Sequence, residues 1–435
     1  MILIKKGLNL PISGHPEPVV SDTPTINKVA IMGNDFEGMK PTMLVKEGEI
    51  VKLGQKIIED KKNPGVFFTS PCGGEVSSIN RGEKRKFLSI EIDIASDEEF
   101  VEFDLDQDPL NLLIESGLFN SFRTRPFNRT PKINDRPDKI FINACDTNPL
   151  SISPDHVITL HKQDFNAGVE FISNLFDSDT NLAYQDDDLS YSFNNVESQQ
   201  FTGPHPAGLS STHINSIYPV SINRTVWTIN YQEVISIGYL LNNGKLRTHK
   251  HISLAGESVF KPSIVSARIG ASLDQLTAGK VKTSSRIISG SVLFGHESVD
   301  VMSYLGFYDN QVSAIPNNPD DIFLNWIMPG KNLHSKLNVF ASAFKKPEKF
   351  SFNTSINGGN RAIVPVGSYE EIIPLDILMT QLLKALVVGD IEVAIDLGML
   401  ELTAEDLALA TYVCPSKYDY CSILMDNLNK VYEEL

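Results

Sequence analysis

The loop from Gln200 to Ile214 holds the residues whose types and spacing come closest to a known chemistry. Glycines, prolines and serines follow one another closely, and a predicted helix begins at the end of the loop. Such a loop can cradle a phosphate, because its backbone N–H groups and the helix N-terminus both attract an anion. The candidate binding residues are Gly203, His205, Pro206, Ala207, Gly208 and His213. Ordinary turns have the same composition, so the loop alone does not define a site.

Three arginines form the one basic island of the sequence. Arg123, Arg125 and Arg129 stand beside Phe122 and Phe127. Arginines in this pattern can bind a phosphate or the carboxylates of a partner protein. The alternative, which we favour, is a loop clamped to the chain's own acids, since the chain has 54 Asp and Glu against 38 Lys and Arg.

Two histidines are a candidate metal site. His249 and His251 stand two residues apart and would share one face of a strand. Imidazoles are common metal ligands. We expect no metal at this pair, because no cysteine or carboxylate pair stands nearby in the sequence.

The overall charge excludes several classes of function. The formal net charge is −16 and the isoelectric point is about 5.0. Nucleic-acid binding needs basic surface to engage phosphate, so no nucleic-acid partner is expected. Direct adhesion to anionic lipid is disfavoured for the same reason. If the protein sits at a membrane, another protein must hold it there.

The sequence predicts a protein with neither a membrane span nor a signal peptide. The most apolar uninterrupted run, Val234 to Leu241, is far shorter than the about 20 residues that a bilayer requires. The first residues lack the apolar stretch and cleavage site of a signal peptide. We therefore expect a cytoplasmic protein whose thiols stay reduced. These thiols are Cys72, Cys145, Cys414 and Cys421.

The elements that must position these residues predict an α+β multidomain fold in five parts. Short β-prone runs separated by Gly and Pro turns predict a barrel-sandwich domain, as in biotinyl and lipoyl carriers, over residues 1–97. Strands alternating with helices predict a Rossmann-like α/β domain over 98–255, although no G-x-G-x-x-G follows any strand. Residues 256–335 resemble a β-grasp domain of soluble ligand-binding proteins. An irregular connector at 336–372 and a helical bundle at 373–435 follow.

Local patterns predict the limits and types of single elements. Thr403 to Asp406 is a capping box, and Asp419 is the N-cap of the last helix. Val157 to Leu160 is predicted as a strand. Lys61 and Lys62 occupy a hairpin tip, where a carrier domain has its modified lysine. The Met or Ala neighbours of such a lysine are missing, which favours an ordinary solvated turn.

Words spread along nearly the whole chain match one family. They include Gly38-Met-Lys-Pro-Thr-Met, Glu59-Asp-Lys-Lys-Asn-Pro-Gly-Val, Gly203-Pro-His-Pro-Ala-Gly-Leu and Gly358-Gly-Asn-Arg-Ala-Ile-Val-Pro. These words and the order of the predicted domains resemble the A subunits of the bacterial Na+-transporting NADH:quinone reductases. The domain order is also similar to that of the NADH- and FMN-binding subunit of respiratory complex I and of the Rnf electron-input subunit.

The resemblance implies a peripheral subunit on the cytoplasmic face of the bacterial inner membrane. The complex would oxidise NADH, reduce ubiquinone to ubiquinol and export Na+. Its five other subunits, integral membrane subunits among them, would carry FMN, FAD and the 2Fe–2S centre. This chain would act as a scaffold in assembly or in quinone handling, with ubiquinone as a possible ligand, and would not be catalytic in isolation. Nothing in the sequence marks a quinone site or a catalytic residue.

Two departures from the electron-input relatives predict that this chain binds no cofactor. Their flavin loop ends in Gly-Gly-Ala-Gly-Phe, whereas His205 and Pro206 here replace the two glycines. Proline lacks an N–H donor, and both side chains fill space that the backbone needs near FMN. Their iron–sulfur run is C-x2-C-x2-C-x3-C-P, of which only Cys414 remains. The other ligand positions hold Ala404, Leu407 and Ala410.

Two other classes of function stay open. One is a stand-alone soluble flavin- or NADH-dependent oxidoreductase with Gly203 to His213 as its active loop. The missing G-x-G-x-x-G and the His-Pro pair count against it. The other is a carrier protein modified at Lys61 or Lys62.

Overall fold

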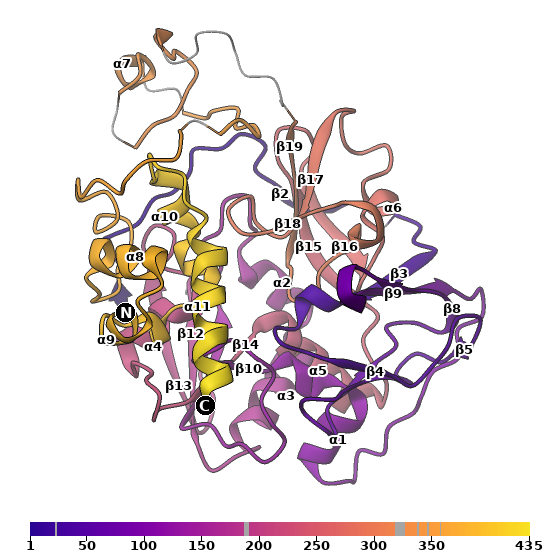
Figure 1. Cartoon of the computed structure of the whole chain (residues 1–435). Coiled ribbons are helices and arrows are strands. Elements are labelled where there is room, and N and C mark those ends of the chain that lie inside the picture. Colours follow the sequence, from indigo (N-terminus) through magenta and orange to yellow (C-terminus); the bar gives the residue numbers. More distant parts are fainter. Residues whose placement is uncertain (22–23, 187–190, 318–326, 337–338, 346–347, 357) are drawn as a thin grey trace.

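The computed structural model describes the chain except for residues 22–23, 187–190, 318–326, 337–338, 346–347 and 357 (Figure 1). Within the described residues, four sheets are followed along the chain by a group of helices. No helix in this part of the chain is long and apolar enough to cross a membrane.

Two small antiparallel sheets form a barrel-sandwich domain in the N-terminal part, as predicted. Strand residues alternate between the two faces of each sheet, so Ile57, Val76, Ile90 and Ile92 are buried between the sheets. The first sheet consists of β3 (Lys28–Met32), β9 (Phe87–Ile94), β8 (Gly74–Arg81) and β5 (Ile50–Val51). The second consists of β4 (Pro41–Met43), β6 (Lys56–Asp60) and β7 (Phe67–Thr69). The turn between β6 and β7 leaves Lys61 and Lys62 exposed.

A six-stranded, mostly parallel sheet forms the α/β part, with strand order β1-β13-β12-β11-β14-β10. Five strands run parallel: β1 (Ile2–Leu3), β13 (Val196–Thr202), β12 (Asp179–Tyr184), β11 (Lys139–Ala144) and β14 (Val226–Asn230). The edge strand β10 (Arg123–Arg125) is antiparallel to β14. The chain moves outward from β11 to β12 and β13 and then returns to β14 on the other side of β11. The carboxyl ends of β11 and β14 therefore border a crevice.

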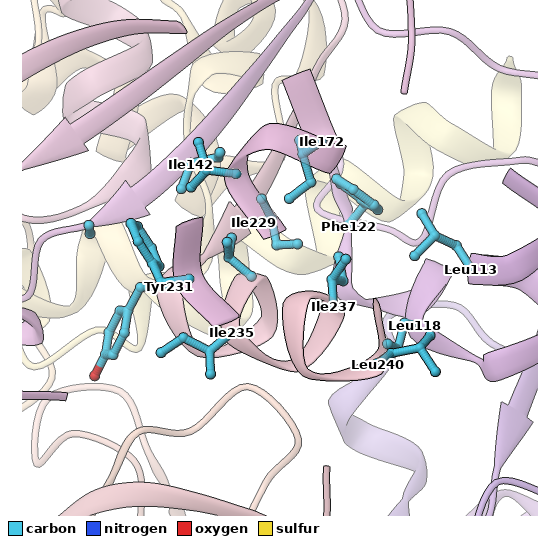
Figure 2. Packing of buried hydrophobic residues seen from close by; sticks show 14 of the residues in the cluster. Leu113, Leu118, Phe122, Ile142, Ile172, Ile229, Tyr231, Ile235, Ile237 and Leu240 are labelled. Atoms are coloured by element: carbon cyan, nitrogen blue, oxygen red, sulfur yellow. The ribbon is translucent and has the colours of Figure 1, made fainter. Parts of the chain in front are cut away.

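Helices cover both faces of this sheet. In β11, Ile140 and Ile142 point into the core with α3 and α5, whereas Phe141 packs with Ile214 of α4 on the opposite face. Figure 2 shows Ile142 and Ile229 from the strands packed near Ile172, Ile235 and Ile237 from the helices. The helices are α1 (Pro109–Ser116), α2 (Pro154–Leu160), α3 (Lys162–Ser173), α4 (Ser210–Ile217) and α5 (Tyr231–Asn243).

Two glycines let α3 and α5 cross at short distance. A Cβ atom at Gly238 would lie 1.7 Å from the carbonyl oxygen of Asp164, and one at Gly168 would lie 2.2 Å from that of Val234. Any side chain at these positions would push the two helices apart. The crossing therefore requires that neither residue carries a side chain.

The predicted strand over Val157 to Leu160 is wrong, because these residues belong to helix α2. Pro154 occupies the first turn, where its missing N–H costs nothing. Val157 and Ile158 are buried on the inner face of the helix. A four-residue apolar run does not by itself separate a buried strand from a buried helix, which explains the error.

A second six-stranded sheet has the order β18-β17-β19-β15-β16-β2. Its strands are β18 (His296–Glu297), β17 (Ser285–Ser289), β19 (Gln311–Pro316), β15 (His249–Ala255), β16 (Ser263–Arg268) and β2 (Glu17–Ser21). The short helix α6 (Leu273–Thr277) packs against it through Leu273 and Leu276. The predicted boundary after residue 255 separates β15 from β16 and β19, the strands to which it is hydrogen-bonded. The predicted boundary after residue 97 places β2 in a different part from its partner strand β16.

The C-terminal part is helical, as predicted, and has its own apolar core. The Thr403 side chain and the Asp406 side chain form the predicted capping box, and Asp419 caps the last helix by accepting from the Ser422 N–H at 3.2 Å. The helices are α8 (Met379–Val388), α9 (Ile391–Asp396), α10 (Ala408–Val413) and α11 (Tyr420–Glu434). The short α7 (Ser342–Lys345) precedes them, and it lies at the top of Figure 1, away from both six-stranded sheets.

Candidate functional site

A cavity of about 560 Å³ opens at the carboxyl ends of β11 and β14, and we call it the strand-end cavity. Asn143 and Asp146 reach it from the end of β11, Asn230 from the end of β14, and Ser210 from the start of α4. Arg123 lines it from edge strand β10. Ligands of open α/β sheets bind in this position, because the connecting loops diverge there and leave polar groups facing a hollow.

The walls of the strand-end cavity are strongly acidic. Its basic and imidazole-bearing lining residues are Arg123 and His296. Burial, reinforced by the charge of Asp309, raises the pKa of Asp35 to about 7, and burial raises the pKa of Asp146 to about 6. Acidic residues outnumber basic ones, so a phosphate group in this cavity would meet net repulsion. The acidic lining residues are Asp35, Glu37, Asp146, Asp309, Glu405 and Asp426.

The glycine-rich loop after β13 is occupied by the chain's own N-terminal segment. The His205 N–H donates to Oδ1 of Asn9 at 2.9 Å, and the Leu8 N–H donates to the carbonyl of His205 at 2.8 Å. The Gly208 N–H donates to Oγ1 of Thr147 at 2.9 Å. These donors, which a phosphate-binding loop would direct at its ligand, are therefore already engaged within the chain.

The two histidines of the loop are buried, and their side chains hold the loop in place by hydrogen bonds. Nδ1 of His205 lies 3.2 Å from Oγ1 of Thr147, and Nε2 of His213 donates to the Ala207 carbonyl at 2.9 Å. Burial lowers the pKa of each histidine to about 4, so both are neutral at pH 7. Among the loop's predicted site residues, Gly208 alone reaches the strand-end cavity, and the histidines hold the loop in place behind it.

The three arginines of the basic island have separate environments. Nη1 of Arg125 donates to Oγ of Ser211 at 2.9 Å, and Nη2 lies 3.6 Å from Oε1 of Glu405. Arg123 and Arg129 instead lie over tyrosine rings, at 4.4 Å and 3.9 Å from the ring centres. Within the part of the chain that the structure describes, neither has a carboxylate within 4 Å. Arg123 is thus a cation that faces the cavity without a paired acid.

The residues at the former iron–sulfur positions form part of the helical core. Ala404, Leu407 and Ala410 are buried. Cys414 is also buried, and its Sγ accepts a hydrogen bond from the Tyr369 hydroxyl at 3.2 Å. Alanine and leucine offer no ligand atom, so these positions do not fit a four-iron cluster, which needs about four thiolates.

The histidine pair of β15 does not converge on one point. His251 Nδ1 lies 3.1 Å from Nε2 of His161, whereas His249 Nδ1 lies 2.9 Å from Oγ1 of Thr248. Nη2 of Arg247 is 3.2 Å from the same His161 nitrogen, which places a positive charge where a metal would sit. Across the described residues, no group of three or more His, Cys, Asp or Glu has the arrangement of a metal site.

The acidic residues of the strand-end cavity were missed by the sequence analysis. Asp35, Asp146 and Asp309 lie far apart along the chain and meet only in the fold. One of them carried a usable signal: Asp146 stands two residues after the end of the buried parallel strand β11. Polar residues at the carboxyl end of such a strand are expected near a ligand crevice.

Comparison with known proteins agrees with this architecture. Three family models match: "NqrA N-terminal barrel-sandwich hybrid domain" over residues 2–95, "NqrA second alpha/beta domain" over 106–246 and "NQRA C-terminal domain" over 251–299. The chain is 46% identical to the A subunit of the Na(+)-translocating NADH-quinone reductase of Haemophilus influenzae, over 100% of both chains. The chain belongs to this NqrA family. The Neisseria meningitidis member is 45% identical over 100% of both chains. The Rhodopirellula baltica member is 46% identical over 99% of this chain and 98% of its own.

As a member of the NqrA family, the chain is a subunit of an oxidoreductase complex. The third family model begins at residue 251, inside β15. Apart from β2, β15 is the first strand of the second six-stranded sheet along the chain. Among solved structures, an NAD+-reducing [NiFe]-hydrogenase covers 42% of this chain and 41% of its own at 13% identity. Its TM-score of 0.34 is too low to bear on fold or function.

Proposed function

We propose that this chain is a peripheral subunit, on the cytoplasmic face of the membrane, that binds neither a flavin nor an iron–sulfur cluster. One observation carries the proposal: the donors of the flavin-type loop are engaged by Asn9, Thr147 and the loop itself. The acidic lining of the strand-end cavity supports it, because FMN and FAD both carry phosphate. The chain then serves as a scaffold, and five other subunits, including integral membrane subunits, supply FMN, FAD, the 2Fe–2S centre and the Na+ path.

The strand order supports a finer classification of the fold. Numbered along the chain, the parallel strands β13-β12-β11-β14 have the order 3-2-1-4, which is that of one Rossmann-type half and its first neighbour. We therefore class this sheet as Rossmann-like and the second six-stranded sheet as the β-grasp part. The proposed parts are 1–97, 98–255, 256–335, 336–372 and 373–435, with β15 belonging by its pairing to the β-grasp part.

A role in quinone handling is consistent with the strand-end cavity. A quinone head is uncharged, so the acidic walls do not repel it as they repel phosphate. Its carbonyl oxygens accept hydrogen bonds, and the Arg123 guanidinium faces the cavity with no carboxylate within 4 Å in the described part of the chain. The names of the relatives include NADH and quinone as the substrates of their complex. We assign ubiquinone, as ligand, to this cavity.

Purification of the complex in mild detergent tests the cofactor-free part of the proposal. The expected result is that membrane subunits and Na+-stimulated NADH:quinone activity accompany this chain, and that the chain is colourless once dissociated. A dissociated chain with a flavin spectrum or sulfide-bound iron would contradict the proposal. A soluble monomer carrying its own flavin would favour the stand-alone oxidoreductase.

Quinone binding is tested on the full chain by titration with a short-chain ubiquinone. Arg123→Gln is expected to weaken binding roughly tenfold, the size of one hydrogen bond from a charged donor. Arg129→Gln is the matched control, because Arg129 also lies over a tyrosine ring but does not line the cavity. Equal loss in both variants, or in neither, would remove the assignment of quinone to this cavity.

A further inference from the structure

A second large cavity lies between the connector and the C-terminal helices, and we call it the bundle cavity. Its volume is about 600 Å³, within the range of sites for drug-sized ligands. Ile12, Leu293, Phe340, Phe350 and Phe352 line it with apolar surface. The lining extends to Val339 and Ile356, which are exposed, so the cavity reaches the molecular surface.

The polar groups of the bundle cavity are cationic or neutral. Its lining includes Lys336, Arg361 and Lys417 and contains no Asp or Glu. Lys336 is 2.8 Å from a carboxylate oxygen of Glu371. Among the described residues, neither Arg361 nor Lys417 has a carboxylate within 4 Å. In a chain with a net charge of −16, an apolar cavity with two uncompensated cations is unexpected.

One of these cations is held in place by the end of α10. Nζ of Lys417 donates to the Tyr412 carbonyl at 2.7 Å, which leaves two of its three N–H groups for a ligand. The Tyr412 hydroxyl lies 2.7 Å from Nδ1 of His334, and both rings line the cavity. The ammonium group is thus positioned at the wall rather than free in solution.

The sequence of residues 327–366, whose described members supply about half of the lining residues, has the same character. It contains six basic residues and a single acidic one, Glu348. It also carries a concentration of exposed large apolar side chains, and Phe344 is 94% exposed. The basic residues are Lys331, Lys336, Lys345, Lys346, Lys349 and Arg361. The exposed apolar residues include Ile327, Val339, Phe344, Ile356, Val364 and Val366.

We propose that the bundle cavity and the described residues of 327–366 (327–336, 339–345, 348–356 and 358–366) bind an anionic phospholipid of the bilayer. The acyl chain would occupy the apolar cavity, and the phosphate would lie at Arg361 and Lys417. Exposed aromatic and aliphatic side chains beside lysines are the combination that enters the headgroup region of anionic membranes. Charge complementarity favours an anionic ligand, because the lining of the bundle cavity has three basic residues and no acidic one.

The proposal qualifies the expectation, drawn from total charge, that this chain does not adhere to anionic lipid. A formal net charge of −16 is a sum over the whole chain, whereas residues 327–366 sum to +5. Charges farther than about 10 Å apart are largely screened at 0.1 M salt, so the local charge decides the contact. The inference rests on the proposed place of the chain at the membrane.

Co-sedimentation of the full chain with vesicles tests the proposal. Binding is expected to vesicles of phosphatidylcholine with phosphatidylglycerol and not to vesicles of phosphatidylcholine alone. The double variant Arg361→Gln/Lys417→Gln should bind on the order of 25-fold more weakly, at about fivefold per charge. Phe344→Ser should weaken binding roughly tenfold, and it removes no buried contact because its side chain is exposed.

The matched control is Lys46→Gln/Lys62→Gln, which removes two exposed lysines of the barrel-sandwich domain and leaves lipid binding unchanged if the proposal is correct. The single variant Arg361→Gln is expected to fold normally because Arg361 is exposed, so a loss of binding in this variant cannot come from misfolding. Equal binding to both kinds of vesicle, equal loss in the control, or binding of free palmitate without any preference for anionic vesicles would each overturn the proposal. The chain would still co-purify with its complex in those cases, so the two proposals fail separately.

Discussion

The strand-end cavity and the bundle cavity have nearly the same volume, about 560 and 600 Å³, but opposite linings. The first has six acidic residues and Arg123. The second has three basic residues, no acidic one and mostly apolar walls. A single net charge for the chain therefore describes neither site. The class of ligand that each cavity can accept is set by its local charge and polarity.

The two cavities also differ in how they are built. Strand ends and helix starts form much of the strand-end cavity, at one end of the parallel sheet whose core α3 and α5 complete. The bundle cavity is walled by residues 332–361, in which the four-residue α7 is the one helix among the described residues, and by the end of α10. We expect substitutions in the scaffold of the first cavity to be more costly than those in the second.

The largest expected effect compares a glycine of the α3–α5 crossing, which packs on the sheet that borders the strand-end cavity, with a glycine near the bundle cavity. Gly238→Ala should lower the free energy of unfolding by about 3 kcal/mol or more, because its Cβ would overlap the Asp164 carbonyl at 1.7 Å. By helix propensity alone, the same change would stabilise the chain by about 1 kcal/mol. Gly359→Ala, beside Pro415 near the bundle cavity, should change stability by less than about 0.5 kcal/mol, since no atom lies within 4 Å of its Cβ position.

Urea unfolding of both variants, followed by fluorescence, checks this difference. Fluorescence reports on the α/β core because Trp227 is fully buried there. Equal midpoints for Gly238→Ala and the unchanged chain would show that the helices can separate without cost. The contrast between the two scaffolds would then be lost.

A smaller effect concerns a half-buried acid of the strand-end cavity. Asp35 has a pKa of about 7 in the folded chain and an ordinary value of 3.8. Between these values the folded state holds more protons than the unfolded state, so stability falls as pH rises from about 4 to 7. Asp35→Asn should remove this loss and raise stability at pH 8, relative to the unchanged chain, by on the order of 2 kcal/mol.

The measurement is urea unfolding at pH 5 and at pH 8. Asp106→Asn, an exposed acid on the same chain, should leave the difference between the two pH values unchanged. If Asp35→Asn shows the same pH dependence as the unchanged chain, Asp35 is ionised in the fold at no cost. The acidic cavity would then be well hydrated and better suited to a cation than the buried geometry indicates.

The smallest effect compares two cysteines, one in each cavity. Cys421 lines the acidic strand-end cavity, and Cys414 lines the cationic bundle cavity. Burial raises the pKa of Cys421 to about 12. Burial also acts against ionisation of Cys414, but hydrogen bonds from Tyr369 and Tyr420 leave its pKa below the ordinary value. Iodoacetate is anionic and iodoacetamide is neutral, so a positive potential speeds alkylation by iodoacetate only. The alkylation rate with iodoacetate divided by the rate with iodoacetamide should therefore be a few-fold higher at Cys414 than at Cys421. Mass spectrometry of single-cysteine variants checks this ratio, and equal ratios would mean that the two cavities do not differ in potential.

Local patterns in the sequence predicted much of the fold. The capping box of Thr403 and Asp406, the N-cap at Asp419 and the barrel-sandwich strands were all confirmed, because caps and turns depend on residues within a few positions of one another. Family-specific words such as Gly203-Pro-His-Pro-Ala-Gly-Leu indicated the right family. The same local view failed at Val157 to Leu160, where only packing against the core distinguishes a helix from a strand.

The tertiary structure alone decided which side chains meet. Asp35, Asp146 and Asp309 come from three sheets or their loops, and no pattern in the sequence joins them. The bundle cavity brings Ile12 to Lys417, across nearly the whole chain. Local propensity sets the type of each element, whereas a cavity is what remains between elements after long-range packing. Its charge and shape therefore depend on contacts that the order of residues does not display.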